Sequence, residues 1–175
     1  MAGPTLDVLF SETQIQARID EMAAAIRETY GDEPVIAVGV LKGSAIFLAD
    51  LVRRLGHNVE MDFVQVSSYG SERSSSGVVQ IRKDLDSNIE GRHVLIVEDI
   101  IDTGITLAHL RELLSVRKPK SLRFATLLSK PEARQRHIPV EFVGFEIPNE
   151  FVVGYGLDFA EKFRNLPYIA ILRDQ

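Results

Sequence analysis

The sequence predicts an α/β fold built on a central, mostly parallel β-sheet flanked by helices. Short apolar runs rich in β-branched residues alternate with helical segments over the first 130 residues, and this alternation is typical of parallel sheets. Charged or hydroxyl-bearing residues follow several of these runs directly. Because ligands of such sheets bind beyond the carboxyl ends of the strands, the sequence also predicts the edge at which a functional site lies.

The first predicted helix follows residue 11. Ser11 and Gln14 have the spacing of a capping box, which predicts that a helix begins there. Gly31 ends the helix. Apolar side chains recur at helical spacing between these limits, which predicts one buried face. That face consists of Ile15, Ile19, Met22, Ala23 and Ile26.

The remaining elements follow in order along the chain. Residues 34–40 predict a strand, residues 45–55 a helix, residues 59–66 a second strand and residues 78–82 a short returning strand. The serine-rich stretch 67–77 is typical of a functional loop. A strand at 94–97, a helix carrying Leu107, Leu110 and Leu114, and a strand at 122–128 come next. Short strands are expected near 142–145, 151–154 and 169–172.

Composition limits the possible classes of protein. A chain of 175 residues predicts one domain with room for a core. Its 20 Lys and Arg against 25 Asp and Glu give a net charge of −5, which does not favour nucleic-acid binding. There is no cysteine, so disulfides and thiolate metal sites are excluded. No signal peptide and no long apolar run are evident, so we expect a soluble cytoplasmic protein without membrane contacts.

The most informative segment runs from Val94 to Leu107. Its apolar start predicts a buried strand, and three carboxylates, Glu98, Asp99 and Asp102, follow closely. Like charges at the end of a buried strand require a cationic or hydroxyl-rich ligand. The next residues, 103–106, offer backbone N–H groups, two hydroxyls and a helix N-terminus, which suit a phosphate. The segment therefore predicts a sugar phosphate bound together with a divalent metal.

This segment resembles the phosphoribosyl-diphosphate signature of the type I phosphoribosyltransferases, and three further stretches extend the resemblance. Leu41-Lys42-Gly43 matches the pyrophosphate loop of that family, and Ser67-Ser68-Tyr69-Gly70 matches its flexible lid. Residues 142–148 and 151–158 match the base-binding hood of the 6-oxopurine branch. The motifs occur in the family's order between about Val35 and Leu172, and together they resemble those of the bacterial hypoxanthine and hypoxanthine-guanine members.

The resemblance implies an activity and an organisation. The reaction expected is transfer of the 5-phosphoribosyl group from phosphoribosyl diphosphate to hypoxanthine or guanine, which gives IMP or GMP plus pyrophosphate, with xanthine as a further candidate base. Mg²⁺ is the expected cofactor, and a homodimer or homotetramer the expected assembly. Residues 1–175 would form one phosphoribosyltransferase domain. Its core would span about 35–130, its lid about 67–79, and its hood the N-terminal segment and about 131–175.

The resemblance also assigns roles to individual residues. Asp102 is the expected general acid or base at N7 of the purine. The expected sugar-phosphate ligands are Glu98, Asp99, Asp102, Thr103, Gly104, Ile105 and Thr106. Those of pyrophosphate are Lys42, Gly43 and Arg164, and those of the purine are Lys130, Phe151, Val152 and Asp158. Ser68 and Tyr69 belong to the lid, and Glu98, Asp99 and Asp158 are the expected metal ligands. The Leu41–Lys42 peptide of this family can be cis.

Each of these residues also has a plainer interpretation. Asp102 could cap the following helix, and Lys42 could simply begin a helix. Lys130 could lie on the surface, whereas Phe151 could pack in the core, together with Val152. An ion pair could account for Asp158 and Arg164. Three departures from the family pattern leave the base preference and the kinetics of the lid open: Ser129 before the lysine, Phe159 after Asp158, and Ser71-Glu72-Arg73 in the lid.

Three other functions compete with the transferase. A nucleotide-sensing RNA-binding regulator on the same fold would need a basic face, which the net charge does not suggest, and retention on heparin would reveal it. A phospho-acceptor receiver domain would carry its acidic pair after the first strand instead of deep in the chain. A transferase specific for adenine or a pyrimidine is the nearest alternative within the family.

Overall fold

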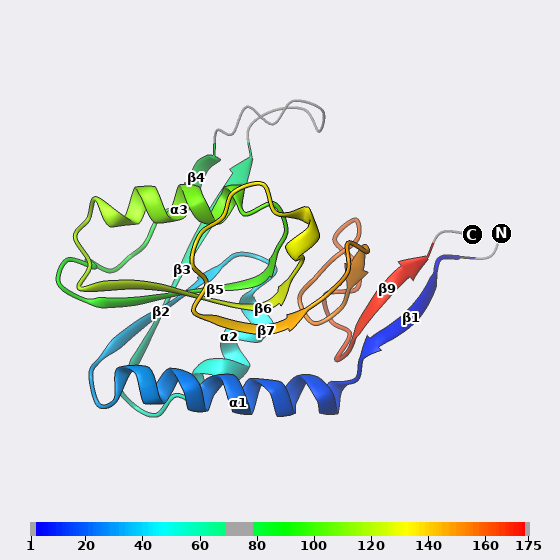
Figure 1. Ribbon diagram of the computed structural model, residues 1–175, viewed down its shortest axis with the longest axis horizontal. Coiled ribbons are helices and arrows are strands. Elements are labelled where there is room, and N and C mark those ends of the chain that lie inside the picture. Colours follow the sequence, from blue (N-terminus) through cyan, green and yellow to red (C-terminus); the bar gives the residue numbers. More distant parts are fainter. Residues whose placement is uncertain (1–2, 69–78, 174–175) are drawn as a thin grey trace.

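The computed structural model describes residues 3–68 and 79–173. A six-stranded sheet with the order β4-β3-β2-β5-β6-β7 forms its centre. Helices α1 (Glu12–Tyr30) and α2 (Ala45–Val52) cover one face, and α3 (Ile105–Ser115) covers the other (Figure 1). The predicted class, an α/β fold with a mostly parallel sheet between helices, is confirmed.

The strands of the central sheet run parallel except for β4 at one edge. β2 (Val35–Val40) lies between β3 (Val59–Ser68) and β5 (His93–Ile101), and β5 pairs in turn with β6 (Ser121–Ser129). β7 (Phe142–Glu146) closes the far edge in parallel, whereas β4 (Val79–Lys83) pairs with β3 antiparallel. The carboxyl ends of β2, β5 and β6 therefore meet at one edge of the sheet.

Alternating side chains of the strands fill two separate cores. On β2, Ile36 and Val38 join the core under α3, whereas Val35 and Ala37 face α1 and α2. β5 divides its side chains in the same way. Because both faces of these strands are buried, the sequence shows continuous apolar runs instead of an apolar–polar alternation.

Local signals determine where α1 begins and ends. The Ser11 side chain accepts a hydrogen bond from the Gln14 amide at 3.2 Å, and the Gln14 side chain accepts one from the Ser11 amide at 2.9 Å. Gly31 follows the last turn with a φ of 59°. The predicted capping box and the predicted stop are both confirmed. Helix α2 is shorter than predicted, because the chain turns at residues 53–55 before Gly56.

A second, three-stranded sheet with the order β1-β9-β8 lies beside the carboxyl edge of the central sheet (Figure 1). It consists of β1 (Thr5–Phe10), β9 (Ile169–Arg173) and β8 (Val152–Val153). The N-terminal strand β1 was not predicted, because none of its residues is buried and its partner β9 lies at the other end of the chain. A short 3-10 helix, Pro131–Ala133, completes the elements.

Residues 69–78, which include Tyr69 of the predicted lid, lie outside the described residues, and the Ser68 side chain is not described either. In the part of the chain that is described, no helix is long and apolar enough to span a membrane.

Candidate active site

Residues from three neighbouring strands gather at the carboxyl edge of the sheet. Lys42 follows β2 and Lys130 follows β6. Glu98 and Asp99 lie within β5, near its carboxyl end. The Lys130 amide donates to the Ile101 carbonyl at 2.9 Å, so the ends of β5 and β6 are tied together. The predicted convergence of these residues is confirmed, although β5 continues through the acids to Ile101 instead of ending before them.

The turn after β5 is shaped to receive an anion. Gly104 adopts a φ of 83° and precedes the first residue of α3, so the amides of the helix start point into the turn. A hollow of about 190 Å³ lies here. Its lining residues are Glu98, Ile100, Ile101, Asp102, Thr103, Gly104, Thr106 and Leu107. The turn thus offers amides, hydroxyls and a helix N-terminus to a phosphate group.

The helix-cap interpretation of Asp102 is wrong. Gly104, which has no side chain, is the N-cap residue of α3. Asp102 instead lies beside Lys130, with 3.4 Å between Asp102 Oδ1 and Lys130 Nζ. The side chain of Asp102 is 52% exposed, whereas that of Lys130 is only 9% exposed. The surface interpretation of Lys130 is therefore also wrong, and a buried ammonium and an accessible carboxylate share one place at the edge.

Glu98 and Asp99 form a pair of adjacent acids, of which Glu98 is buried and Asp99 is partly buried. Burial, followed by the charge of Asp99, raises the pKa of Glu98 well above its usual value. Burial also raises the pKa of Asp99, although hydrogen bonds from Glu98 and the Ile100 amide and the charge of Arg164 oppose this. The pair would gain from a bound cation or from donor hydroxyls.

Gly43 lies directly against the Asp99 side chain, so any larger residue would displace that carboxylate. A Cβ atom at this position would come within 1.9 Å of Asp99 Oδ2. The Leu41–Lys42 peptide before it is cis, as the family resemblance allows. The loop after β2 therefore packs directly on the acids at the end of β5.

Backbone contacts extend from Gly43 to the segment after β8. A Cβ atom at Gly156, where φ is 98°, would meet the Gly43 carbonyl oxygen at 2.1 Å. Arg164 donates to the Gly156 carbonyl at 2.7 Å, and its Nη2 lies 3.3 Å from Asp158 Oδ1. Lys42, Gly43 and Arg164, the predicted pyrophosphate ligands, thus lie in one contact network. The ion-pair interpretation of Asp158 and Arg164 is also true of the structure.

Two predicted purine contacts, Phe151 just before β8 and Val152 within it, differ in exposure. Phe151 is 51% exposed and meets Phe159 edge to face, with 5.9 Å between ring centroids. Val152 is buried. Core packing is therefore the wrong interpretation for Phe151, whose exposed ring is free to stack on a base. The Val152 side chain does pack in the core, which leaves its backbone as the part that could contact a ligand.

Sequence analysis missed a strap over the phosphate turn. The amides of Gln135 and Arg136 both donate to the Thr103 carbonyl, at 2.8 and 2.9 Å. A Cβ atom at Gly104 would approach the Arg136 carbonyl oxygen to 2.3 Å. Arg134 donates to the Ser129 hydroxyl at 2.6 Å. Residues 134–136, the strap, thus fix the position of the turn. Of the residues in these contacts outside the turn, the sequence analysis had noted only Ser129.

A second missed contact joins α2 to the segment after β8. The Tyr155 hydroxyl donates to Asp50, which also accepts from Gln16 at 3.2 Å and from Arg53 at 2.6 Å. Burial and the Asp50 carboxylate raise the pKa of Tyr155 far above its usual range, so the phenol stays protonated. Because α2 begins just after Gly43, this contact helps to fix the loop against Gly156.

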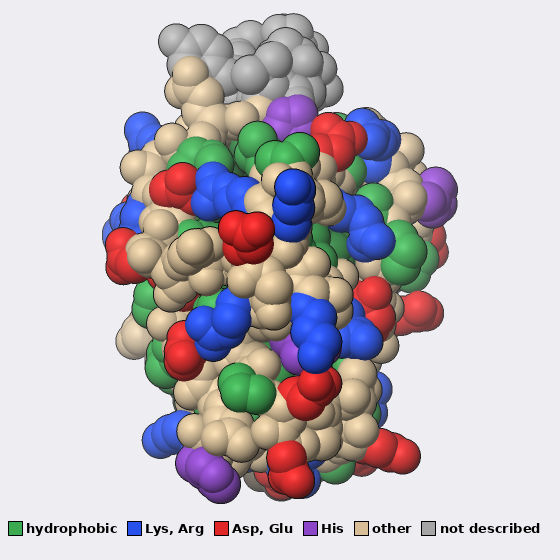
Figure 2. Space-filling model, turned by 90° about the vertical axis from the view of Figure 1, so that its left-hand side faces the viewer, with side chains coloured by type: hydrophobic (Ala, Val, Ile, Leu, Met, Phe, Trp, Pro, Cys, Tyr) green, Lys and Arg blue, Asp and Glu red, His purple; other side chains and the backbone are tan. Residues whose placement is uncertain are grey.

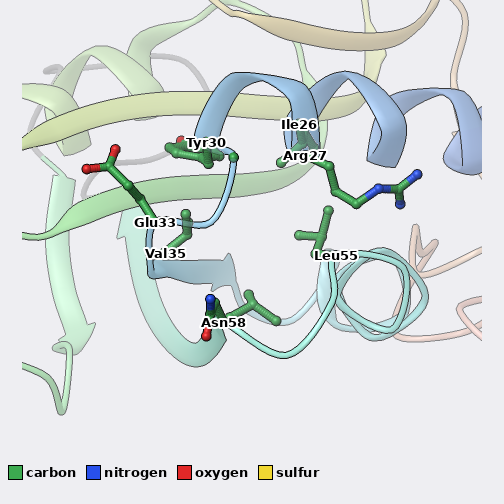
Figure 3. A pocket seen from close by; sticks show the side chains of 9 residues that line it. Ile26, Arg27, Tyr30, Glu33, Val35, Leu55 and Asn58 are labelled. Carbon is green, nitrogen blue, oxygen red and sulfur yellow. The ribbon is translucent and has the colours of Figure 1, made fainter.

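Another pocket lies at the opposite edge of the sheet, between the end of α1 and the turn after α2 (Figure 3). Tyr30, Val35, Leu55 and Asn58 are among its lining residues, and Arg27 donates to the Arg54 carbonyl beside it. Its volume of about 30 Å³ suits a water molecule and not a nucleotide. It lies at the amino ends of the strands and therefore takes no part in the site.

Comparison with known proteins points in one direction. A family model described as "Phosphoribosyl transferase domain" matches residues 7–160. The hypoxanthine-guanine phosphoribosyltransferase of Bacillus subtilis is 53% identical over 166 residues, which cover 95% of this chain and 92% of that protein. The hypoxanthine phosphoribosyltransferase of Escherichia coli K12 is 52% identical over 175 residues, which cover 98% of each.

Solved structures show the same similarity in three dimensions. A hypoxanthine phosphoribosyltransferase from Staphylococcus aureus superposes with a TM-score of 0.92 at 49% identity, covering 95% of this chain and 91% of that one. A hypoxanthine-guanine phosphoribosyltransferase from Bacillus anthracis gives 0.91 at 48% identity, covering 94% and 97%. The similarity therefore extends over nearly the whole chain in both sequence and fold.

Proposed function

The chain belongs to the family of phosphoribosyl transferase domains, and from this premise we propose that it transfers the 5-phosphoribosyl group of phosphoribosyl diphosphate to hypoxanthine or guanine. The products are IMP or GMP and pyrophosphate, and the reaction serves purine salvage. The observation that carries this proposal is the pairing of Asp102 and Lys130, 3.4 Å apart, with Asp102 in the lining of the hollow at the phosphate turn.

The donor binds along the edge from the phosphate turn to Lys42. The 5′-phosphate accepts hydrogen bonds from the amides of residues 103–106 and from the two threonine hydroxyls. The carboxylates of Glu98 and Asp99 accept hydrogen bonds from the 2′ and 3′ hydroxyls of the ribose, which ionised carboxylates do strongly. Lys42 and Arg164 bind the diphosphate. The transition state has oxocarbenium character, so these contacts act by positioning and by charge stabilisation.

Magnesium fits the donor set, because Mg²⁺ takes oxygen ligands and is often held by one or two carboxylates together with substrate phosphates. Glu98 and Asp99 are adjacent carboxylates, and among the described residues neither forms an ion pair, whereas Asp102, Asp158 and Glu161 do. Among the described residues, no three acidic or histidine side chains cluster in a metal cage. Mg²⁺ bound there would neutralise the diphosphate, and Asp158 stays a prediction for a second ion.

The base binds between Phe151 and Lys130. Phe151 stacks on the purine ring, the backbone of Val152 meets its edge, and the Lys130 ammonium donates to O6. Asp158 is the fourth proposed purine contact. Asp102 holds or takes the proton at N7 while the bond from N9 to the ribose forms. Lys130 lies beside Asp102 in the empty site. It would therefore contact both the base and Asp102, the residue that handles the N7 proton.

The RNA-binding alternative gains no support from the face in Figure 2. On that face Lys and Arg side chains are interspersed with Asp and Glu (Figure 2). Ion pairs such as Glu33 with Lys120 and Arg92 with Glu60 likewise combine the two signs of charge. A phosphate-binding stripe would need one sign of charge. We also propose a cytoplasmic location, a lid at residues 67–79 that closes over the site, and assembly as a homodimer or homotetramer.

A substrate assay tests the proposed function. Purified protein supplied with Mg²⁺ and phosphoribosyl diphosphate is expected to convert hypoxanthine to IMP and guanine to GMP, and to convert adenine poorly. Chelation with EDTA is expected to stop the reaction, and added Mg²⁺ to restore it. Nucleotides separated by chromatography give the measurement, with xanthine and uracil as further bases. Preferential use of adenine or uracil, or no turnover of any base, would contradict the proposal.

A further inference from the structure

A tight loop between β8 and β9 directs the carboxylate of Glu161 at Lys42 and Arg164, the two proposed cationic ligands of the diphosphate. Phe159 and Lys162 exchange two backbone hydrogen bonds of 3.0 Å, and the Glu161 amide donates to Asp158 at 2.9 Å. Ala160 and Glu161 have φ values of 51° and 64°, in the left-handed region that side chains other than glycine rarely adopt. This backbone turns the Glu161 side chain toward Lys42.

The carboxylate of Glu161 bridges two cations. Its Oε2 lies 3.1 Å from Lys42 Nζ, and its Oε1 lies 3.4 Å from Arg164 Nη2. These contacts hold the pKa of Glu161 below its usual value, so the group is charged at neutral pH. Residues 42 and 164 are far apart in the sequence, and within residues 3–68 and 79–173 only the carboxylate of Glu161 pairs with both. A carboxylate with one oxygen on each cation imitates a bridging phosphate.

Arg164 is incompletely satisfied in this arrangement. Its Nη1 donates to the Gly156 carbonyl at 2.7 Å, but its buried Nε has no hydrogen-bond partner among the described residues. The side chains of Lys42 and Glu161 are 58% and 65% exposed, so their ion pair is weak and opens readily. The carboxylate is therefore a replaceable occupant of the cation pair.

We propose that Glu161 is a built-in competitor for the diphosphate group of the donor and for the pyrophosphate product. Together with Asp158, which also pairs with Arg164, it balances the charge of Lys42 and Arg164 while the site is empty. It moves away when a diphosphate binds, and it returns as pyrophosphate leaves. The proposal rests on the proposed function, because it takes these cations as the diphosphate ligands. Its consequence is a weaker affinity for both diphosphates than the cations alone would give.

Replacing Glu161 with glutamine tests this role. E161Q keeps the size of the side chain and removes its charge. Because an exposed ion pair contributes little, the expected effect is a decrease of about threefold to fivefold in the Kd of pyrophosphate, measured by titration calorimetry with Mg²⁺ present. The gain should shrink as ionic strength rises. The Kd of IMP, which carries no diphosphate, should stay unchanged.

Glu21→Gln is the matched control. Glu21 also pairs with an arginine three residues away, Arg18, and its side chain is 67% exposed against 65% for Glu161. Its replacement should leave the Kd of pyrophosphate unchanged. If wild-type protein binds pyrophosphate and E161Q binds it equally or more weakly, the competitor role is wrong while the proposed function stands. If wild-type protein binds neither pyrophosphate nor phosphoribosyl diphosphate, both are wrong.

Discussion

Replacing Asp102 with asparagine is expected to lower kcat by about 10²- to 10⁴-fold, the usual contribution of a positioned acid or base. Asparagine keeps the shape of the side chain and can still contact Lys130, but it cannot hold or take the N7 proton. The donor is bound mainly by other groups, the amides of residues 103–106 and the carboxylates of Glu98 and Asp99. Its Kd should therefore change by no more than about threefold.

Two measurements separate these effects for Asp102→Asn. Single-turnover rates with hypoxanthine give the chemical step, and titration with phosphoribosyl diphosphate and Mg²⁺ gives donor affinity. Asp20→Asn is the control. Asp20 is an exposed carboxylate on α1 that pairs with Arg54 at 2.5 Å, away from the carboxyl edge of the sheet. Equal losses of rate and donor affinity in D102N would show that Asp102 binds the donor and does not move the proton.

Replacing Lys130 with alanine is expected to lower kcat/KM for hypoxanthine by about 10- to 100-fold, since a hydrogen bond from a charged donor contributes about 1.5–3 kcal/mol. Adenine presents an amino donor where hypoxanthine presents O6, so the ammonium opposes adenine. Its loss should leave the adenine rate unchanged or raise it. The ratio of the two kcat/KM values is therefore expected to fall by at least about tenfold.

Lys130→Met provides a check on packing for this experiment, because methionine fills the space of the largely buried lysine stem without a donor. Thermal unfolding of both variants should show that each is folded. Lys120→Ala is the control, since Lys120 pairs with Glu33 at 2.8 Å at the opposite edge of the sheet. Unchanged selectivity in both Lys130 variants would remove this residue from base recognition.

The central sheet could be predicted because its signals are local. β2 and β5 are short apolar runs, and α1 has its own capping box and stop. β1 could not be predicted in this way: its Val8 is 61% exposed, and pairing with β9, at the other end of the chain, is what makes it a strand. Tertiary contacts of this kind leave no periodicity in the local sequence.

In the site, too, the contacts between residues close in sequence could be predicted, whereas those between distant residues could not. The acids and the phosphate turn lie within a few residues of one another, so one segment of sequence revealed their chemistry. The strap of Gln135 and Arg136 on Thr103, and the contact of Glu161 with Lys42, join residues that are distant in sequence. They depend on backbone geometry and on which loops meet at the edge, and neither shows in the order of residue types.

The most direct test of the account is a crystal structure of the protein with phosphoribosyl diphosphate and Mg²⁺. The account predicts the 5′-phosphate on the amides of residues 103–106, the ribose hydroxyls on Glu98 and Asp99, and the diphosphate between Lys42 and Arg164. A donor bound at another part of the molecule, or no bound donor at saturating concentration, would contradict it.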